Sequence, residues 1–141
     1  MKIAIINGPN LNLLGKREPE VYGNETFETY LNTLFNIFSD VQFQYFQSNI
    51  EGELVNAIQE YGFTTVGIIL NPAGYTHTSV AIGDAVAAIP AAVVEVHISN
   101  IFAREEFRKH SHVSAKSDGV ISGLGLKGYE LAVRYLIDSL K

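Results

Sequence analysis

Two kinds of apolar pattern alternate along the chain, and their alternation predicts an α/β fold. Short apolar runs are typical of strands, whereas apolar residues spaced three and four positions apart form one face of a helix. The runs predict strands at residues 2–7, 41–47, 65–70, 91–97 and 119–122. The spaced patterns predict helices at residues 27–38, 51–61, 79–89 and 129–140.

The order of these elements narrows the topology. The run at 65–70 is apolar on both faces, as in the centre of a parallel sheet, whereas the run at 41–47 alternates and suits a sheet edge. Strands alternating with helices form a parallel sheet covered on both faces, and right-handed crossovers leave few arrangements. With the second strand at an edge, we expect one three-layer α/β domain over residues 1–141, with the flavodoxin-like strand order 2-1-3-4-5.

Individual residues predict where the helices begin and end. Asn24 or Thr26 can cap the first helix. Ser48 followed three positions later by Glu51 fits a capping box for the second helix, and Gly62 is a plausible stop for it.

Composition and charge exclude several classes of protein. The formal net charge of −5 argues against a nucleic-acid binder, which should carry a basic face. Cysteine is absent, so disulfides, thiolate nucleophiles and cysteine metal sites are excluded. The first apolar run is too short for a secretory signal, and no window has the ~20 apolar residues of a membrane span. We therefore expect a cytoplasmic protein.

The connection after the first strand is the most informative stretch. Residues 7–23 separate that strand from the first helix, whereas such loops usually have about 2–6 residues. Gly15 and Gly23 could act as hinges of a lid. Long loops of this kind are commonly functional, and this one carries polar groups suited to chemistry: Asn10, Asn12, Lys16, Arg17 and Tyr22.

The remaining candidates follow the carboxyl ends of other predicted strands, where open parallel sheets bind ligands. His97 ends the fourth strand two residues after Glu95, so both side chains share one sheet face and the carboxylate can orient the imidazole. A core histidine with a satisfied hydrogen bond is the alternative. His77 can contact a ligand or simply cap a helix, and Arg108 can grip a carboxylate or remain a surface charge.

Two motifs suggest functions that we do not favour. Residues 123–128 match G-x-G-x-x-G, but only 13 residues follow, without the second strand and acidic residue of a dinucleotide site. A tight turn into the last helix is the better interpretation. His110 and His112 have the spacing of strand-borne metal ligands, yet no third ligand accompanies them, so exposed histidines are expected.

Four blocks of sequence resemble one family, type II 3-dehydroquinate dehydratase. They are NGPNLNLLGKREPEVYG at 7–23, NPAGYTHTS at 71–79, EVHISN at 95–100 and REEFRKHS at 104–111. The resemblance covers essentially the whole chain. It implies a hydro-lyase that converts 3-dehydroquinate to 3-dehydroshikimate by trans elimination of water through an enolate, in aromatic biosynthesis (the shikimate pathway) or quinate breakdown. It also implies no metal, no cofactor and no Schiff base, and assembly as a dodecamer built from trimers.

The resemblance also implies roles for individual residues. Tyr22 is the base that takes a proton from C2, and Arg17 favours its phenolate. Asn10 holds the water that stabilises the enolate oxygen, and His97 protonates the departing C1 hydroxyl. The substrate-binding positions are Asn71, His77, Ile98 and Ser99 through their amides, Arg108, and Asp84 from a neighbouring subunit. The small residues of the predicted helix at 79–89, including Gly83, allow close packing against the sheet or against such a subunit.

Two alternatives belong to other functional classes. A flavodoxin-like small-molecule binding or signalling module without turnover would favour a phosphate-cradling loop or an acidic pair after the first strand, and residues 7–9 offer neither. A family member that binds without turnover is disfavoured because Asn10, Arg17, Tyr22 and His97 are all present.

Overall fold

A five-stranded parallel sheet forms the centre of the computed structural model, which describes residues 1–16, 20 and 24–140. The strand order β2-β1-β3-β4-β5 is the flavodoxin-like order that the sequence predicts. The edge position of the second strand is also confirmed. The strands are β1 (Lys2–Asn7), β2 (Gln42–Gln47), β3 (Gly67–Asn71), β4 (Ala92–His97) and β5 (Gly119–Ser122).

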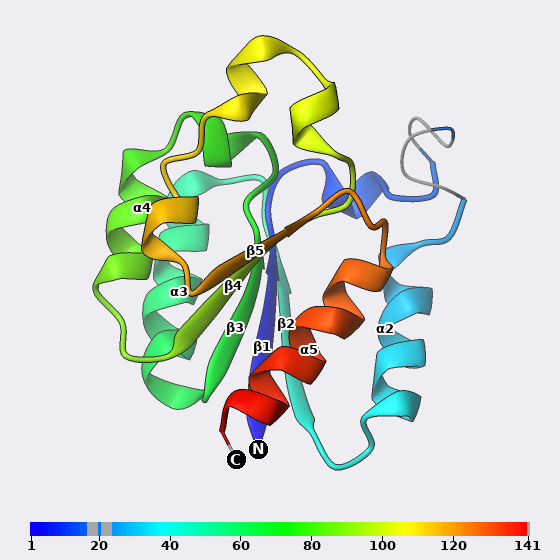
Figure 1. Ribbon diagram of the computed structural model, residues 1–141. Helices are drawn as coiled ribbons and strands as arrows, with labels where there is room; N and C mark the ends of the chain where they lie inside the picture. The colour runs from blue at the N-terminus through cyan, green and yellow to red at the C-terminus, as the bar shows by residue number, and fades with distance from the viewer. Residues whose placement is uncertain (17–19, 21–23, 141) are drawn as a thin grey trace.

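Helices cover both faces of this sheet, which gives the three predicted layers (Figure 1). On one face lie α2 and α5, and on the other lie α3 and α4. Their bounds are α2 (Phe27–Ile37), α3 (Glu51–Thr64), α4 (Val80–Ala87) and α5 (Lys127–Ser139). Among the described helices, none is both long enough and apolar enough to cross a membrane.

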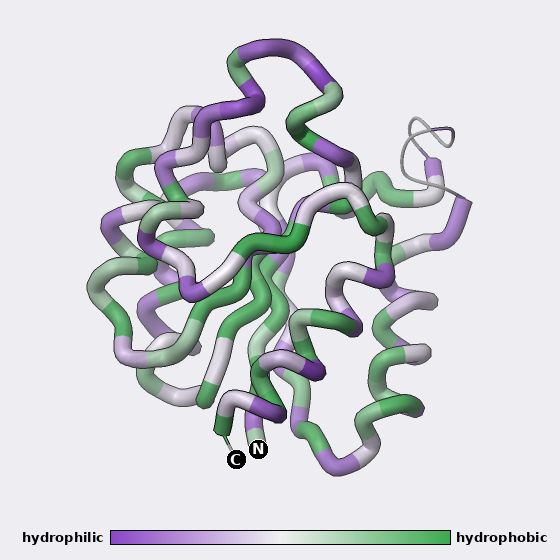
Figure 2. The backbone as a smooth tube through the Cα atoms, viewed as in Figure 1, coloured by the Kyte–Doolittle hydropathy of each residue, from purple (hydrophilic) through white to green (hydrophobic). Residues whose placement is uncertain are grey.

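Alternation along β1 divides the core into two halves. Ile3 and Ile5 pack with α2 and α5, whereas Ala4 and Ile6 pack with α3 and α4. All four side chains are fully buried, which explains why residues 3–6 form an unbroken apolar run; the strands at the centre of the fold are mostly green in Figure 2. Burying each isoleucine contributes about 1.5–3 kcal/mol, so this interior strand holds both helical layers on the sheet.

The predicted start is confirmed for α2 and is wrong for α3. The Thr26 hydroxyl accepts the Thr29 N–H at 3.3 Å and caps α2, as predicted. The prediction of a capping box at Ser48 was wrong. Ile50 is the cap residue of α3, and the Ser48 hydroxyl instead accepts the Ile50 N–H at 3.0 Å. The serine therefore stabilises the turn two residues before the helix cap, outside the helix itself.

Gly62 does not end α3, so that prediction was also wrong. The helix continues to Thr64, and Gly62 is buried within it. A Cβ at this position would lie 2.4 Å from Ile89 Cγ2, so glycine is required by close packing rather than by a helix stop. Gly83 plays a similar part in α4, where a Cβ would lie 2.3 Å from the His112 carbonyl oxygen.

The connection between β4 and β5 is structured. Residues 99–118 lie above the ends of β3 and β4 (Figure 1) and include three 3-10 helices. These are η3 (Ile101–Ala103), η4 (Glu106–Lys109) and η5 (Ser114–Lys116). After β5, Gly123 and Gly125 adopt positive φ angles of 91° and 62°, which form the predicted tight turn into α5.

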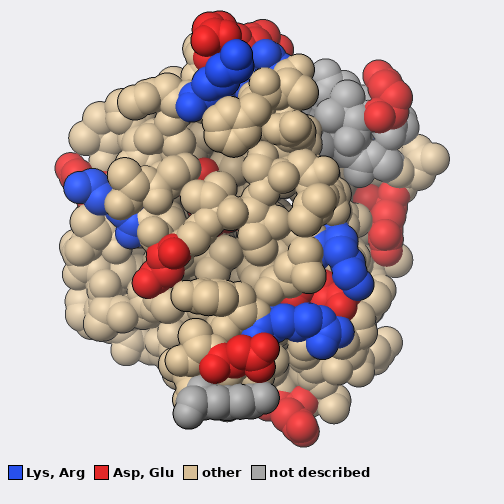
Figure 3. Space-filling model, viewed as in Figure 1, with Lys and Arg blue, Asp and Glu red and all other residues tan. Residues whose placement is uncertain are grey.

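Basic and acidic side chains are interspersed on the visible surface. Figure 3 shows them next to each other over η4 and over α5. Lys109 pairs with Glu106 at 2.9 Å, and Glu130 binds both Lys127 at 2.7 Å and Arg134 at 2.8 Å. Opposite charges therefore neutralise each other at these places on the face that Figure 3 shows.

Candidate active site

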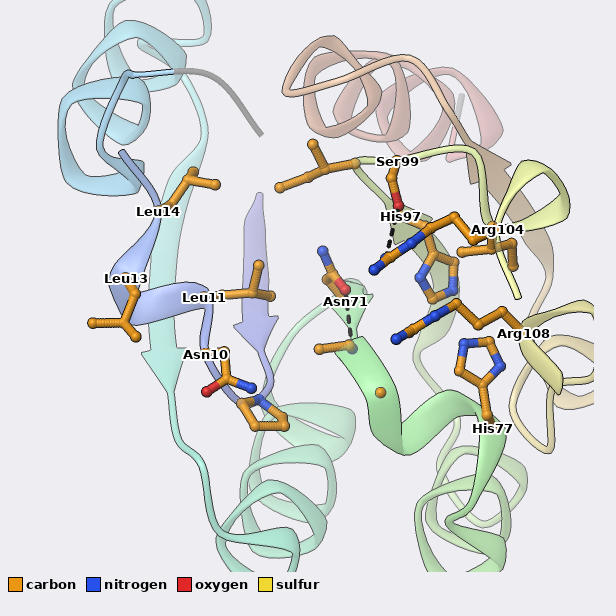
Figure 4. A pocket seen from close by; sticks show the side chains of 15 residues that line it. Asn10, Leu11, Leu13, Leu14, Asn71, His77, His97, Ser99, Arg104 and Arg108 are labelled. Carbon is orange, nitrogen blue, oxygen red and sulfur yellow. Dashed lines mark hydrogen bonds between the residues drawn. The ribbon is translucent and has the colours of Figure 1, made fainter. Parts of the chain in front are cut away.

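A cavity of about 130 Å³ lies at the carboxyl edge of the sheet, between the segment that follows β1 and the segments that follow β3 and β4. This is the switch point of the strand order, where open α/β sheets bind ligands. Figure 4 shows Asn10 and three leucines on one side and the histidines and arginines on the other. Seven residues predicted from the sequence line it: Asn10, Asn71, His77, His97, Ile98, Ser99 and Arg108.

Asn10 is held in place by its backbone. Its φ and ψ angles of 72° and −6° are left-handed, a conformation that asparagine tolerates better than most residues. The Asn10 N–H donates to Asn49 Oδ1 at 3.0 Å, and Gln47 Nε2 donates to the Gly8 carbonyl at 3.2 Å. The loop therefore leaves β1 on a defined path that places Asn10 at the cavity wall.

Glu95 and His97 form the predicted pair on β4. Glu95 Oε2 lies 2.5 Å from His97 Nε2, and the two residues are 0% and 5% exposed. A carboxylate can only accept, so the imidazole donates from Nε2 and its Nδ1 is the nitrogen left for other partners. The buried carboxylate therefore fixes the ring and its tautomer, as the spacing of the two residues predicts.

Three hydroxyl groups complete the surroundings of Glu95, and the sequence reasoning missed them. Ser114 Oγ lies 3.0 and 3.1 Å from the two carboxylate oxygens, Thr76 Oγ1 lies 3.3 Å from Oε2, and Ser111 Oγ lies 3.4 Å from Oε1. Buried charge is tolerated when its hydrogen-bonding capacity is used in this way. The available signal was the run of serines and threonines in the segments that follow β3 and β4.

His77 lies at the end of the 3-10 helix η2 (Ala73–His77), and its ring is stacked 6.5 Å from that of His97. His77 Nδ1 lies 2.7 Å from the His110 carbonyl, so Nδ1 donates and Nε2 is left as an acceptor. Burial lowers the pKa of His77, and the charges of Arg108 and His97 act in the same direction, whereas the bond to the His110 carbonyl opposes them. A neutral imidazole near neutral pH follows.

Two arginines line the cavity. Arg108 lines it, and its Nε donates to Glu105 while its guanidinium lies 4.9 Å from the Phe107 ring centroid. Arg104, which we did not single out from the sequence, also lines the cavity and donates to Ser99 Oγ at 3.3 Å. The signal in the sequence that could have identified Arg104 was its position four residues before Arg108. Guanidinium groups bind carboxylates strongly, so the site suits an anionic ligand.

The turn after β4 contributes a backbone donor. The Ile98 carbonyl accepts the Gly125 N–H at 3.0 Å. Because the two polar groups of a trans peptide point in opposite directions, the Ser99 N–H points away from Gly125. Both Ile98 and Ser99 line the cavity, which agrees with a binding site for a carboxylate there.

Of the remaining candidates, Asp84 is not among the residues that line the cavity. Asp84 lies on α4 with an exposed side chain. Arg17 and Tyr22 lie outside the described residues.

Fold and site together define a class: a flavodoxin-like α/β protein whose switch-point cavity combines imidazole and guanidinium groups for an anionic small molecule. The chain belongs to a particular family within it, because the sequence model of "Dehydroquinase class II" matches residues 1–137.

Known proteins with similar sequences include 3-dehydroquinate dehydratases. The chain is 52% identical over 134 residues to the 3-dehydroquinate dehydratase of Cereibacter sphaeroides, which covers 94% of this chain and 91% of that protein. It is 51% identical over 146 residues to the Aliarcobacter butzleri protein of the same name, covering 100% and 89%.

Solved structures of type II dehydroquinases have the same fold as this chain. The type II dehydroquinase of Butyrivibrio crossotus superposes with a TM-score of 0.93 at 46% identity, over 96% of this chain and 97% of that one. That of Propionibacterium acnes gives 0.91 at 42% identity, over 96% and 94%.

Proposed function

We propose that this chain is a type II 3-dehydroquinate dehydratase, a hydro-lyase that removes water from 3-dehydroquinate to form 3-dehydroshikimate. The observation that supports it most strongly is the buried Glu95–His97 pair at an arginine-lined cavity in a chain belonging to this family. Such a pair suits a proton transfer, and the arginines suit the substrate carboxylate.

The acid half of the reaction is assigned to His97. The C1 hydroxyl is a poor leaving group unless it is protonated, and histidine is the side chain that holds and releases a proton near neutral pH. With Nε2 donating to Glu95, the proton delivered to the leaving oxygen comes from Nδ1. The ionised Glu95 stabilises the imidazolium form before that transfer.

The base half is assigned to Tyr22, assisted by Arg17. A free phenol ionises near pH 10, so about one in a thousand is ionised at neutral pH. A neighbouring guanidinium favours the phenolate, which then takes the proton from C2 beside the ketone. The resulting enolate needs a preorganised donor at oxygen, and a water held by Asn10 supplies it.

Substrate binding is assigned to the other side of the cavity. The Ser99 and Ile98 amides and Arg108 bind the carboxylate, while Asn71 and His77 bind ring hydroxyls. Asp84 is exposed on α4 in this chain, which is compatible with a role in the site of a neighbouring subunit. We accordingly propose a cytoplasmic homo-oligomer, a dodecamer of trimers, and sedimentation of an active monomer at micromolar concentration would exclude this assembly.

The proposal is tested by adding 3-dehydroquinate to the purified protein and following the ultraviolet absorbance of the conjugated product. Turnover that survives a chelator, and also borohydride in the presence of substrate, is expected. The variant His97→Ala should lose about 10²–10⁴-fold in kcat. Binding of 3-dehydroquinate without any product would favour the binding module instead, and a borohydride-dependent covalent label on lysine would indicate Schiff-base chemistry.

A further inference from the structure

Tyr129 connects the buried interior of the protein to the wall of the active site. It lies on α5, is 0% exposed, and packs edge-on against Phe27 with 4.8 Å between ring centroids. Its hydroxyl lies 2.8 Å from Asn7 Oδ1 and 2.9 Å from Asn71 Nδ2, at the carboxyl ends of β1 and β3. Asn7 and Asn71 are paired neighbours in the sheet. The tyrosine is thus bonded to both strands that flank the switch point.

The directions of the hydrogen bonds that join Asn71, Tyr129 and Asn7 are determined. The Ala73 N–H is only a donor and lies 3.0 Å from Asn71, so the atom facing it is the Asn71 oxygen. The Asn71 nitrogen, only a donor, therefore faces the tyrosine oxygen. The single proton of Tyr129 must then go to Asn7 Oδ1.

Two features keep this arrangement from reversing. Burial raises the pKa of Tyr129 far above its ordinary value, so the hydroxyl keeps its proton throughout the working range. The carbonyl end of Asn71 holds the turn at Ala73, whose φ of 53° is unusual for alanine and needs such support. A flip of the Asn71 amide would place two donors against each other at Ala73.

We infer that Tyr129 is a positioning residue for the reaction: it locks the Asn71 amide so that the remaining N–H of Nδ2 is presented to an oxygen acceptor on the ligand. This inference rests on the proposed function, in which Asn71 binds the substrate. It assigns Asn71 the role of donor and assigns the recognised substrate group the role of acceptor. Tyr129 acts only through Asn71, since it is not among the residues that line the cavity.

The test compares Tyr129→Phe with Tyr30→Phe in the full chain. Each change removes one buried phenol hydroxyl from the same aromatic cluster, in which the two rings lie 6.3 Å apart. Among the hydrogen bonds of the described residues, none joins the Tyr30 hydroxyl to Asn7 or Asn71, so its removal should leave KM unchanged. Tyr129→Phe should raise KM for 3-dehydroquinate by about 2- to 10-fold, the value of one hydrogen bond, with a smaller effect on kcat.

A double-mutant cycle separates positioning from general stability. In an Asn71→Ala background, Tyr129→Phe should add no further increase in KM, because the group it orients is gone. An equal rise in KM with and without Asn71, or the same KM change in Tyr30→Phe, would overturn the inference.

If Tyr129→Phe does not fold, Asn7→Ala replaces it. Without the acceptor, the tyrosine proton can turn toward Asn71, and KM should rise similarly. An unchanged KM in that variant would also overturn the inference. Absence of turnover in the wild-type chain would instead remove the proposed function.

Discussion

Glu95→Gln is the substitution that tests the buried acid–base pair most directly. It keeps the size and shape of the side chain but removes its charge. The carboxylate is fully buried, lies 2.5 Å from His97 Nε2 and is hydrogen-bonded by the hydroxyls of Thr76, Ser111 and Ser114. These hydroxyls can rotate and accept from the new amide, so the fold should survive.

The magnitude follows from the change in one hydrogen bond. A bond to a charged group contributes about 1.5–3 kcal/mol, and a neutral one about 0.5–1.5 kcal/mol. The difference, about 1–2 kcal/mol, applies to the form of the enzyme whose imidazole carries the proton that it delivers, so this competent form becomes scarcer relative to the neutral form when the charge is removed. At 1.36 kcal/mol for each tenfold change, kcat should fall by roughly 5- to 30-fold, while KM changes little.

The assay is steady-state formation of the conjugated product, with Glu130→Gln as the matched control. Glu130 is also nearly buried and binds two cations, but it lies on α5 and is not among the residues lining the cavity. The control should lose stability with kcat preserved. If Glu95→Gln kept kcat within twofold of wild type, the carboxylate would not act through His97. A rise in KM alone would make Glu95 a binding residue.

Three further predictions concern other parts of the chain. Gly62→Ala should destabilise the protein by about 1–3 kcal/mol through overpacking, whereas Gly52→Ala in the same helix, with no atom within 4 Å of the added Cβ, should stabilise it by up to about 1 kcal/mol. Urea unfolding measures the stability of both variants. A Gly62→Ala variant as stable as wild type would contradict the packing argument. His77 should titrate below pH 6.5 by NMR; its neutral form is favoured in the folded state, so its contribution to stability is complete above pH 6.5 and declines as pH falls through the lowered pKa. A midpoint at or above 6.5 would refute this. Tyr22→Phe should abolish turnover, while Arg17→Ala should be slow at neutral pH and recover partly as pH rises; an unshifted basic limb of its pH–rate profile would mean that the arginine does not tune the base.

Local patterns in the sequence account for the sheet and for the general location of the site. Periods of two and of three to four residues are set by which face of an element is buried, and this information lies within each segment. The alternation at 41–47 thus predicted the edge strand β2, and the apolar run before His97 predicted its place at a strand end. The spacing of Glu95 and His97 predicted a shared face for the same reason, since alternate residues of one strand point the same way.

Tertiary structure alone decided the contacts between segments that are distant in sequence. The partners of Tyr129 lie 58 and 122 positions away, and no local period encodes such an approach. Gly62 fits a helix stop by its type, but the approach of Ile89 from another segment makes it a packing residue inside the helix. The hydroxyls around Glu95 come from two separate connections, and only their folding over the sheet edge brings them to the buried charge. Segment positions follow from burial, which acts on each segment, whereas hydrogen-bond partners and close contacts depend on how the segments meet in space.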